Sequence, residues 1–517
     1  MSKKINIKKE AIISLIRIIT SVVLGFVTVP LIIRVIGKTG YGVLTIVLTV
    51  TSYSALLQLG LGNTIVRYIA KYSGINTKTE HQIVSMAFAF YCGISLIALV
   101  SAVLLYFRLE FIFAFEQGQI ATAKTLFIIY SLDAIITLPF TAFYSYLKGH
   151  NQFSVFNTTL IIRTVLRFVV IYVLFRMGFG IFALAVVDVS LNQSINLFNF
   201  LYSRIKLKLR FDFRFKDKQL LKEIFLFTLF TFITQIIDYF YWRTDNVLLG
   251  IMTTTDTVAE YNAGQTIIQY FKEFATVISG VTLPTLSMLT NERDRESKIN
   301  DFLHKTSHLQ SMIIIPIILG FWLFGKQFLN VWLDGLGFEN AYMFALVIII
   351  PLGIVLIQST HVNMLFAMNK HRLRVWILFI SAVLNLAISA FLVNRIGAIG
   401  ASLGTGIMLF LGDFVAINFV YYKVTGFNVL KFYKAILPRM LICCVPPTIA
   451  GLFIRNMTLF ESNLMDLGTK CAIFGVLYLI PLYFLQLKPE QTGPLVKLSR
   501  KGEVPFTLGA GSSVKND

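Results

Sequence analysis

The sequence predicts an all-α polytopic membrane protein with about fourteen transmembrane helices. The 517 residues are 56% hydrophobic and only 14% charged, and this is too few charges for the surface of a soluble protein. The apolar residues form segments close to the ~20 residues that cross a bilayer as a helix. Lys and Arg residues concentrate in every second loop, as positive charge does on the cytoplasmic side of a membrane.

The predicted segments follow one another with short polar breaks. The first six cover 11–36, 41–71, 81–106, 121–147, 152–176 and 178–201, the next six 222–251, 257–290, 303–330, 341–367, 371–394 and 396–422, and the last two 431–455 and 466–486. The first segment is too long for a signal-peptide core and lacks a small-residue cleavage pattern, so we expect it to remain in the membrane.

Loop charges predict the orientation. With the N-terminus in the cytoplasm, about 30 Lys and Arg residues face the cytoplasm and about eight face the other side. A missed helix would reverse the pattern downstream, and it does not reverse, so both termini are predicted to be cytoplasmic. The net charge of +20 is explained by these loops, and we expect no nucleic-acid binding.

An internal repeat predicts the domain organisation. RMGFGIFA (176–183) and RIGAIGAS (395–402) are similar Gly-rich turns at corresponding places in two halves of the chain. An even number of helices per half makes such a repeat parallel, with substrate expected between the halves near the midplane. The predicted parts are an N-lobe (1–201), a basic cytoplasmic linker (202–222), a C-lobe (223–422), two further helices (423–486) and a cytoplasmic tail expected to be disordered (487–517).

Charges inside the N-lobe segments are the first candidate site residues, because ionisable groups at membrane depth usually face a cavity or a partner. The candidates for binding an anionic substrate are Arg17, Arg34, Arg163 and Arg167, and those for ion coupling are Asp133 and Asp188. Arg163 and Arg167 are four residues apart and therefore lie on one helix face near mid-depth. Two such guanidiniums suit a phosphate ligand. Ion pairs with Asp133 or Asp188 are an equally good interpretation.

The C-lobe segments contain a second set of charges. Arg243 and Lys272 are further binding candidates, and Asp238 and Asp413 are candidates for proton or sodium coupling. Three aromatic residues lie among them, namely Tyr239, Tyr241 and Trp242. They indicate either a sugar-binding surface or an interfacial aromatic belt. A hydrogen bond to a neighbouring helix is the structural alternative for Asp413.

Enzyme and metal signatures are weak. The sequence GFWLFGKQ (320–327) imitates a phosphate-binding loop but lies in an apolar helix and lacks the terminal Ser or Thr. The four cysteines form no CxxC pair and indicate small core residues. We therefore predict a transporter without catalytic residues, metal site or cofactor, apart from a coupling ion, Na⁺ or H⁺.

Four motifs carry a family resemblance. PLIIRVIGKTGYG (30–42), LGLGNTIVRYIA (59–70), DNVLLG (245–250) and AEYNAG (259–264) resemble segments of the polysaccharide (oligosaccharide, O-antigen-type) flippases. These belong to the multidrug, oligosaccharidyl-lipid and polysaccharide exporter superfamily, which also contains multidrug extruders and lipid II flippases. The resemblance covers most of the chain up to the twelfth segment.

The resemblance implies a V-shaped pair of six-helix lobes with alternating access. It also implies a lipid-linked, undecaprenyl-diphosphate-type oligosaccharide moved from the inner to the outer leaflet of a bacterial cytoplasmic membrane. The expected partners are this lipid, membrane lipids, and a polysaccharide polymerase with chain-length machinery. A cation-coupled multidrug exporter and a lipid II flippase are the alternatives, and a membrane enzyme is disfavoured by the short outer loops.

Overall fold

The computed structural model describes residues 7–486 except 216, 277–278, 291–294, 369 and 371. Every regular element in this described part is a helix, and eleven of its helices are long and apolar enough to cross a membrane. The predicted class of multi-pass helical membrane protein is confirmed, whereas the number of fourteen spans stays a prediction. The tail, 487–517, lies outside the described residues.

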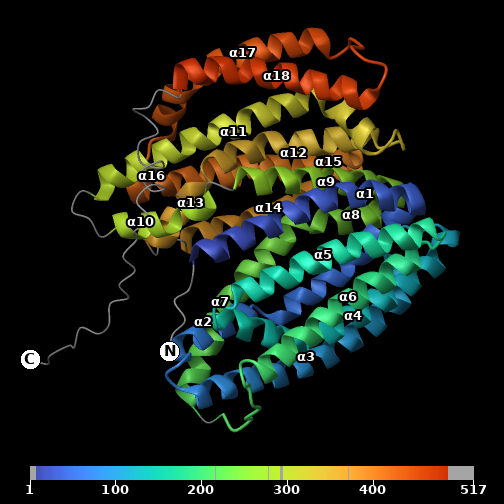
Figure 1. The fold of residues 1–517 in the computed structure, drawn as a ribbon, viewed down its shortest axis with the longest axis vertical. Helices are drawn as coiled ribbons and strands as arrows, with labels where there is room; N and C mark the ends of the chain where they lie inside the picture. Colours follow the sequence, from blue (N-terminus) through green and yellow to red (C-terminus); the bar gives the residue numbers. More distant parts are fainter. Residues whose placement is uncertain are drawn as a thin grey trace, which may run out of the picture. The chain divides into compact units, whose positions relative to one another are not determined.

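Each predicted segment coincides with one or more helices (Figure 1). The first half of the chain forms α1 (Ile7–Ser52), η1 (Tyr53–Gln58), α2 (Leu61–Tyr72), α3 (Thr77–Ile112), α4 (Gln117–Gly149), α5 (Phe153–Arg176) and α6 (Ile181–Ile205). The second half forms α7 (Lys218–Trp242), α8 (Thr244–Met252), α9 (Thr255–Ala275), η2 (Ser279–Val281), α10 (Leu283–Leu289), α11 (Arg295–Trp332), α12 (Glu339–Ile357), α13 (Ser359–Ala367), α14 (Arg372–Ile396), α15 (Ile399–Met408), the π-helix η3 (Leu409–Ala416) and α16 (Ile417–Thr425). The last two helices are α17 (Val429–Ile454) and α18 (Asn463–Gln486).

Helix α1 contains the first predicted segment and the start of the second, and Gly37 lies at the break between them. Its φ of 75° and ψ of 168° interrupt α1 at the break predicted between 36 and 41. This conformation favours glycine, because a Cβ atom would clash with the backbone. The chain therefore turns at Gly37 and continues as helix towards Ser52.

The helices form two compact units. Among the described residues, the larger comprises those within 7–318 and 325–427, and the smaller comprises those within 319–324 and 428–486. In the larger unit, α4 packs on α3 and α6, and α1 on α5, while α9 packs on α12 and α14 on α15. Elements of the two predicted lobes meet where α1 packs along α9 and α2 along α7. In the smaller unit, α17 packs on α18.

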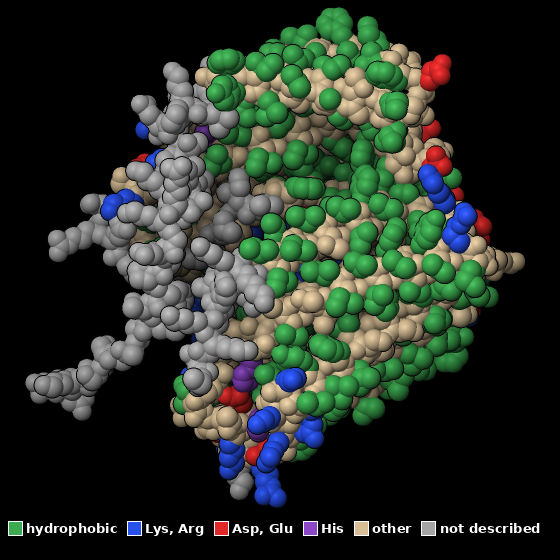
Figure 2. Space-filling model, viewed as in Figure 1, with side chains coloured by type: hydrophobic (Ala, Val, Ile, Leu, Met, Phe, Trp, Pro, Cys, Tyr) green, Lys and Arg blue, Asp and Glu red, His purple; other side chains and the backbone are tan. Residues whose placement is uncertain are grey.

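Surface chemistry follows the membrane prediction. Figure 2 shows hydrophobic side chains along the length of α3–α6 and Lys and Arg side chains gathered near helix ends. Leu96 and Phe107 on α3 are 66% and 65% exposed. Apolar side chains exposed along a whole helix are expected where the solvent is hydrocarbon.

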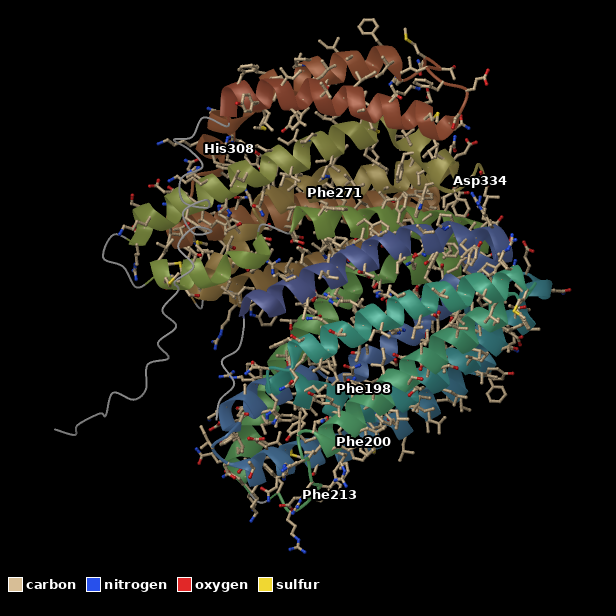
Figure 3. The ribbon with its side chains drawn as sticks, viewed as in Figure 1. Phe198, Phe200, Phe213, Phe271, His308 and Asp334 are labelled. Atoms are coloured by element: carbon tan, nitrogen blue, oxygen red, sulfur yellow. The ribbon has the colours of Figure 1, made fainter. Side chains whose placement is uncertain are left out.

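The predicted basic linker is packed against the lobe rather than free. Its Leu209 is buried in a cluster with residues of α2, α3, α4 and α7. The Asp212 N–H donates to Ser85 Oγ at 2.8 Å, and Gln82 Nε2 donates to Asp212 Oδ2 at 2.9 Å. These bonds hold the linker on the start of α3, while the side chain of Phe213, labelled in Figure 3, is exposed.

Candidate functional site

A cavity of about 590 Å³ lies among α1, η1, α4, α5 and α6. Arg163 and Arg167 of α5 both line it, because residues four apart share a helix face. Arg163 is ten residues after Phe153, or about 15 Å along the helix, close to mid-depth. The other polar residues in its wall are Ser21, Thr28, Thr51, Ser52, Ser54, Gln58, Tyr130, Asp133, Thr137, Thr164, Asp188, Asn192 and Tyr239.

Arg167 is neutralised within the protein. Its Nε donates to Asp188 Oδ1 and its Nη2 to Asp188 Oδ2 at 3.1 Å, and Tyr130 OH donates to the same carboxylate at 3.3 Å. The pair is half-buried, with 29% and 14% of the two side chains exposed. For Arg167, the structure therefore favours the ion-pair interpretation.

Arg163 has a different environment. Asp133 accepts hydrogen bonds from the neutral amides of Asn192, at 3.0 and 2.9 Å, and of Gln193. The Nε atom of Arg163 is buried without a hydrogen-bond partner, and no described residue forms an ion pair with it. Arg163 is therefore the guanidinium in this cavity that keeps a hydrogen-bond donor available to a ligand, with Asp133 and Asp188 near enough to act on its charge.

The remaining predicted arginines lie elsewhere. Arg17 is one helical turn before Ser21 on α1, and its Nε is likewise buried without a partner. Arg34 pairs with Asp334 at 3.1 Å on an exposed surface (Figure 3). Arg243 lies over the ring of Tyr239, 5.9 Å from its centroid. The predicted binding set thus separates into cavity residues and peripheral ones.

A second cavity of about 180 Å³ lies inside the C-lobe and is lined by three of its four predicted site charges. Lys272, Asp238 and Asp413 line it, together with Arg374. Tyr241 OH donates to Asp413 Oδ2 at 2.8 Å, and Lys272 Nζ lies 4.3 Å from the ring centroid of Trp242. Asp413 belongs to the π-helix η3, a kind of element that often marks functional positions. Arg374, at the start of α14, is a lining residue that was not among the predicted site residues.

Polar contacts join the lobes at the end predicted to face away from the cytoplasm. Lys38 Nζ donates to Glu260 of α9 and, at 2.6 Å, to the carbonyl oxygen of Gly337. Glu260 also accepts from the Asn340 N–H at 3.0 Å, and Thr39 Oγ1 donates to Asp256 at 2.7 Å. We call these residues the Lys38 gate. They hold α1 to the C-lobe at this end.

Comparison with known proteins assigns the family. A sequence model described as polysaccharide biosynthesis protein matches residues 7–290, more than half of the chain. The chain belongs to the polysaccharide biosynthesis protein family. The match includes all N-lobe elements, both cavity arginines and the α1–α9 contact.

The three known proteins compared with this family member are each less than 25% identical to it. It is 24% identical over 216 residues to the probable low-salt glycan biosynthesis flippase Agl15 of Haloferax volcanii, which covers 39% of this chain and 44% of Agl15. The chain thus matches less than half the length of this relative. The solved lipid II flippase MurJ, in an inward closed conformation, is 18% identical with a TM-score of 0.71, over 92% of this chain and 98% of MurJ. An inward-facing multidrug resistance MATE family transporter is 12% identical with a TM-score of 0.65, over 79% and 95%. The last two likenesses establish the shared fold.

Asp245 is the polar residue in this family member that sequence reasoning undervalued. It was not among the predicted site residues, and it is only 5% exposed. Tyr261 OH and Thr405 Oγ1 donate to its Oδ2 at 2.6 and 2.7 Å, and Asn385 Nδ2 donates to Thr405 at 3.2 Å. Its identified partners are hydroxyls, and no described cationic side chain pairs with it. The signal that could have found it is a carboxylate within an apolar segment directly before Asn246.

Proposed function

We propose that the protein is a flippase that moves a lipid-linked oligosaccharide of the undecaprenyl-diphosphate type from the cytoplasmic to the outer leaflet. The observation that carries this proposal is Arg163, a mid-depth guanidinium in a polar cavity that forms no ion pair with a described residue. Desolvating such a charge is costly unless an anion compensates it. The guanidinium fork matches phosphate oxygens, so a diphosphate is the chemistry that fits best.

The cavity chemistry also suits a glycan beside the diphosphate. Hydroxyl and amide side chains such as Thr51, Gln58 and Asn192 line the same space. These groups both donate and accept hydrogen bonds, as sugar hydroxyls require. The family description and the name of Agl15 support a glycan cargo. We accordingly assign a transport role rather than an enzymatic one.

Translocation is proposed to proceed by alternating access. The Lys38 gate joins α1 to the C-lobe at one end, and opening that end must break its bonds. A rocking motion that exchanges these contacts would expose the cavity first to one side and then to the other. The expected orientation places both termini in the cytoplasm and the gate on the outer side of a bacterial inner membrane.

Ion coupling is proposed to involve the carboxylates that form no ion pair within the described part of the chain. Asp245 is a candidate for a proton or Na⁺, because a buried carboxylate surrounded by hydroxyl oxygens suits a hard cation. Asp133, Asp238 and Asp413 remain candidates. Asp188 is the weakest of the set, because Arg167 already compensates its charge.

Two other cargoes are possible on the same fold. A cation-coupled multidrug exporter needs an acidic cavity, and the available Arg163 disfavours organic cations. A lipid II flippase would share the lipid diphosphate but carry a different head group. Surface polysaccharide such as O-antigen or capsule is the proposed product, delivered to a polymerase and its chain-length machinery.

The test is complementation of a strain lacking this gene. Arg163→Ala is expected to abolish surface polysaccharide while the protein accumulates normally in the membrane. Arg176→Ala is the matched control, since Arg176 is an exposed arginine at the end of the same helix. Normal polysaccharide with Arg163→Ala would refute the cavity assignment, and resistance to cationic dyes on expression would favour the exporter.

A further inference from the structure

A second hollow adjoins the cationic cavity on the other side of α5. It measures about 630 Å³ and lies among α1, α5 and α6. We call it the α5–α6 groove and define it by Ile13, Ile162, Leu166, Leu191, Ile195 and Phe198. Its wall is mainly apolar, and Phe198, labelled in Figure 3, lines its α6 side. Ile162 and Leu166 are 51% and 45% exposed.

Arg163 belongs to both spaces. It lines the groove as well as the cavity, while Arg167, one turn later, faces the cavity and Ile162 faces the groove. The same transition occurs on α1, where Ile13 lines the groove and Ser21 and Gly25 line the cavity. The guanidinium of Arg163 therefore stands at the junction between a polar space and an apolar one.

The groove has the length of one leaflet. It follows α5 from Ser154 to Leu166, which is about 18 Å at the rise of an α-helix. Half of the hydrocarbon core is about 15 Å. On α6 it runs from Leu191 to Tyr202, the half of the helix beside the linker. A chain lying here would remain in the leaflet that is predicted to be cytoplasmic.

We propose that the α5–α6 groove binds the hydrocarbon chain of the transported lipid while Arg163 holds its diphosphate. This inference rests on the proposed function and adds the site of the lipid chain. Charge complementarity selects the occupant, because the anionic head must reach Arg163, whose Nε has no hydrogen-bond partner, and its chain must leave the polar cavity. The groove lets the chain leave without burying hydrocarbon among the polar residues of the cavity.

The test compares a long-chain and a short-chain diphosphate on the purified full-length protein. Ile162→Trp and Leu191→Trp each fill the groove, and Val169→Trp is the control, since Val169 is 48% exposed on α5 outside the groove. The groove variants are expected to weaken binding of undecaprenyl diphosphate at least about tenfold and to leave isopentenyl diphosphate within about twofold. Unchanged binding of undecaprenyl diphosphate, or equal weakening of both probes, would overturn the proposal.

Photolabelling separates the transported lipid from bulk lipid. Undecaprenyl diphosphate with a diazirine on its first isoprene units is expected to label residues 154–202. The comparison probe is a diazirine phosphatidylcholine. The proposal would be overturned if this probe labelled the same residues equally and excess undecaprenyl diphosphate failed to displace it. If the wild-type protein bound neither diphosphate, the proposed function would be refuted together with the groove. If it bound both but the groove variants changed nothing, only the role of the groove would be refuted.

Discussion

The Lys38 gate predicts how the conformational equilibrium responds to Glu260→Gln. The Glu260 side chain is 9% exposed and receives both the Lys38 ammonium and the Asn340 N–H. Glutamine keeps one acceptor oxygen but removes the charge. The lost charged hydrogen bond contributes about 2 kcal/mol, above the value of an exposed pair and below that of a fully buried one.

A change of about 2 kcal/mol corresponds to a roughly 30-fold shift in a two-state equilibrium. Glu260→Gln should therefore populate conformations in which α1 is separated from the C-lobe at this end. Spin labels at Val35 and Leu336, both exposed, would report the separation by double electron–electron resonance. The exposed Cys471 must first be replaced so that it does not take up label.

The control is the pair between Lys326 and Glu339, 3.9 Å apart with 66% and 72% of the side chains exposed. Such a surface pair contributes about 0–1 kcal/mol, so Glu339→Gln should leave the distance distribution unchanged. A wild-type distribution for Glu260→Gln would refute the reasoning. So would an equal shift for both variants.

Three further predictions concern packing and charge. Gly42→Ala should destabilise the protein by about 1–3 kcal/mol, because a Cβ there would lie 1.9 Å from a carbonyl oxygen of α9; Gly118→Ala, with open space around it, should not lower the melting temperature. Asp188→Asn should lower the melting temperature more than Asp133→Asn, because it leaves the half-buried Arg167 without its ion-pair partner, whereas the hydrogen-bond partners of Asp133 are neutral amides; the reverse order would contradict this. Asp245→Asn should remove any Na⁺ or pH dependence of transport in proteoliposomes while leaving diphosphate binding intact, and retained dependence would exclude this residue.

The helical membrane class could be predicted because hydrophobic length and loop charge are properties of sequence alone. The predicted apolar segments coincide with helices. The break predicted after the first segment lies at the Gly37 turn. The spacing of Arg163 and Arg167 placed them on one face for the same reason, since helix geometry is fixed. The hydrophobic pattern within a segment indicates whether that segment is helical, without knowledge of its partners in the fold.

Partners of the intramembrane charges could not be predicted, because they depend on which helices meet. Arg34 looked equivalent to Arg163 in sequence, yet it pairs with Asp334 from a distant loop at the surface. The two neighbouring arginines also differ in a way that the sequence could not predict, because Asp188 of α6 forms its ion pair with Arg167, while Arg163 forms none with a described residue. Asp245 was missed because its burial arises from α9 and α15 packing on α8.

The central claim is that Arg163 binds the diphosphate of the transported lipid. The most direct measurement is the affinity of purified wild-type, Arg163→Ala and Arg176→Ala proteins for undecaprenyl diphosphate, for example by native mass spectrometry. A charged hydrogen bond contributes about 1.5–3 kcal/mol, so Arg163→Ala should bind about 10- to 100-fold more weakly, with Arg176→Ala unchanged. Equal affinity of Arg163→Ala and wild type would contradict the claim.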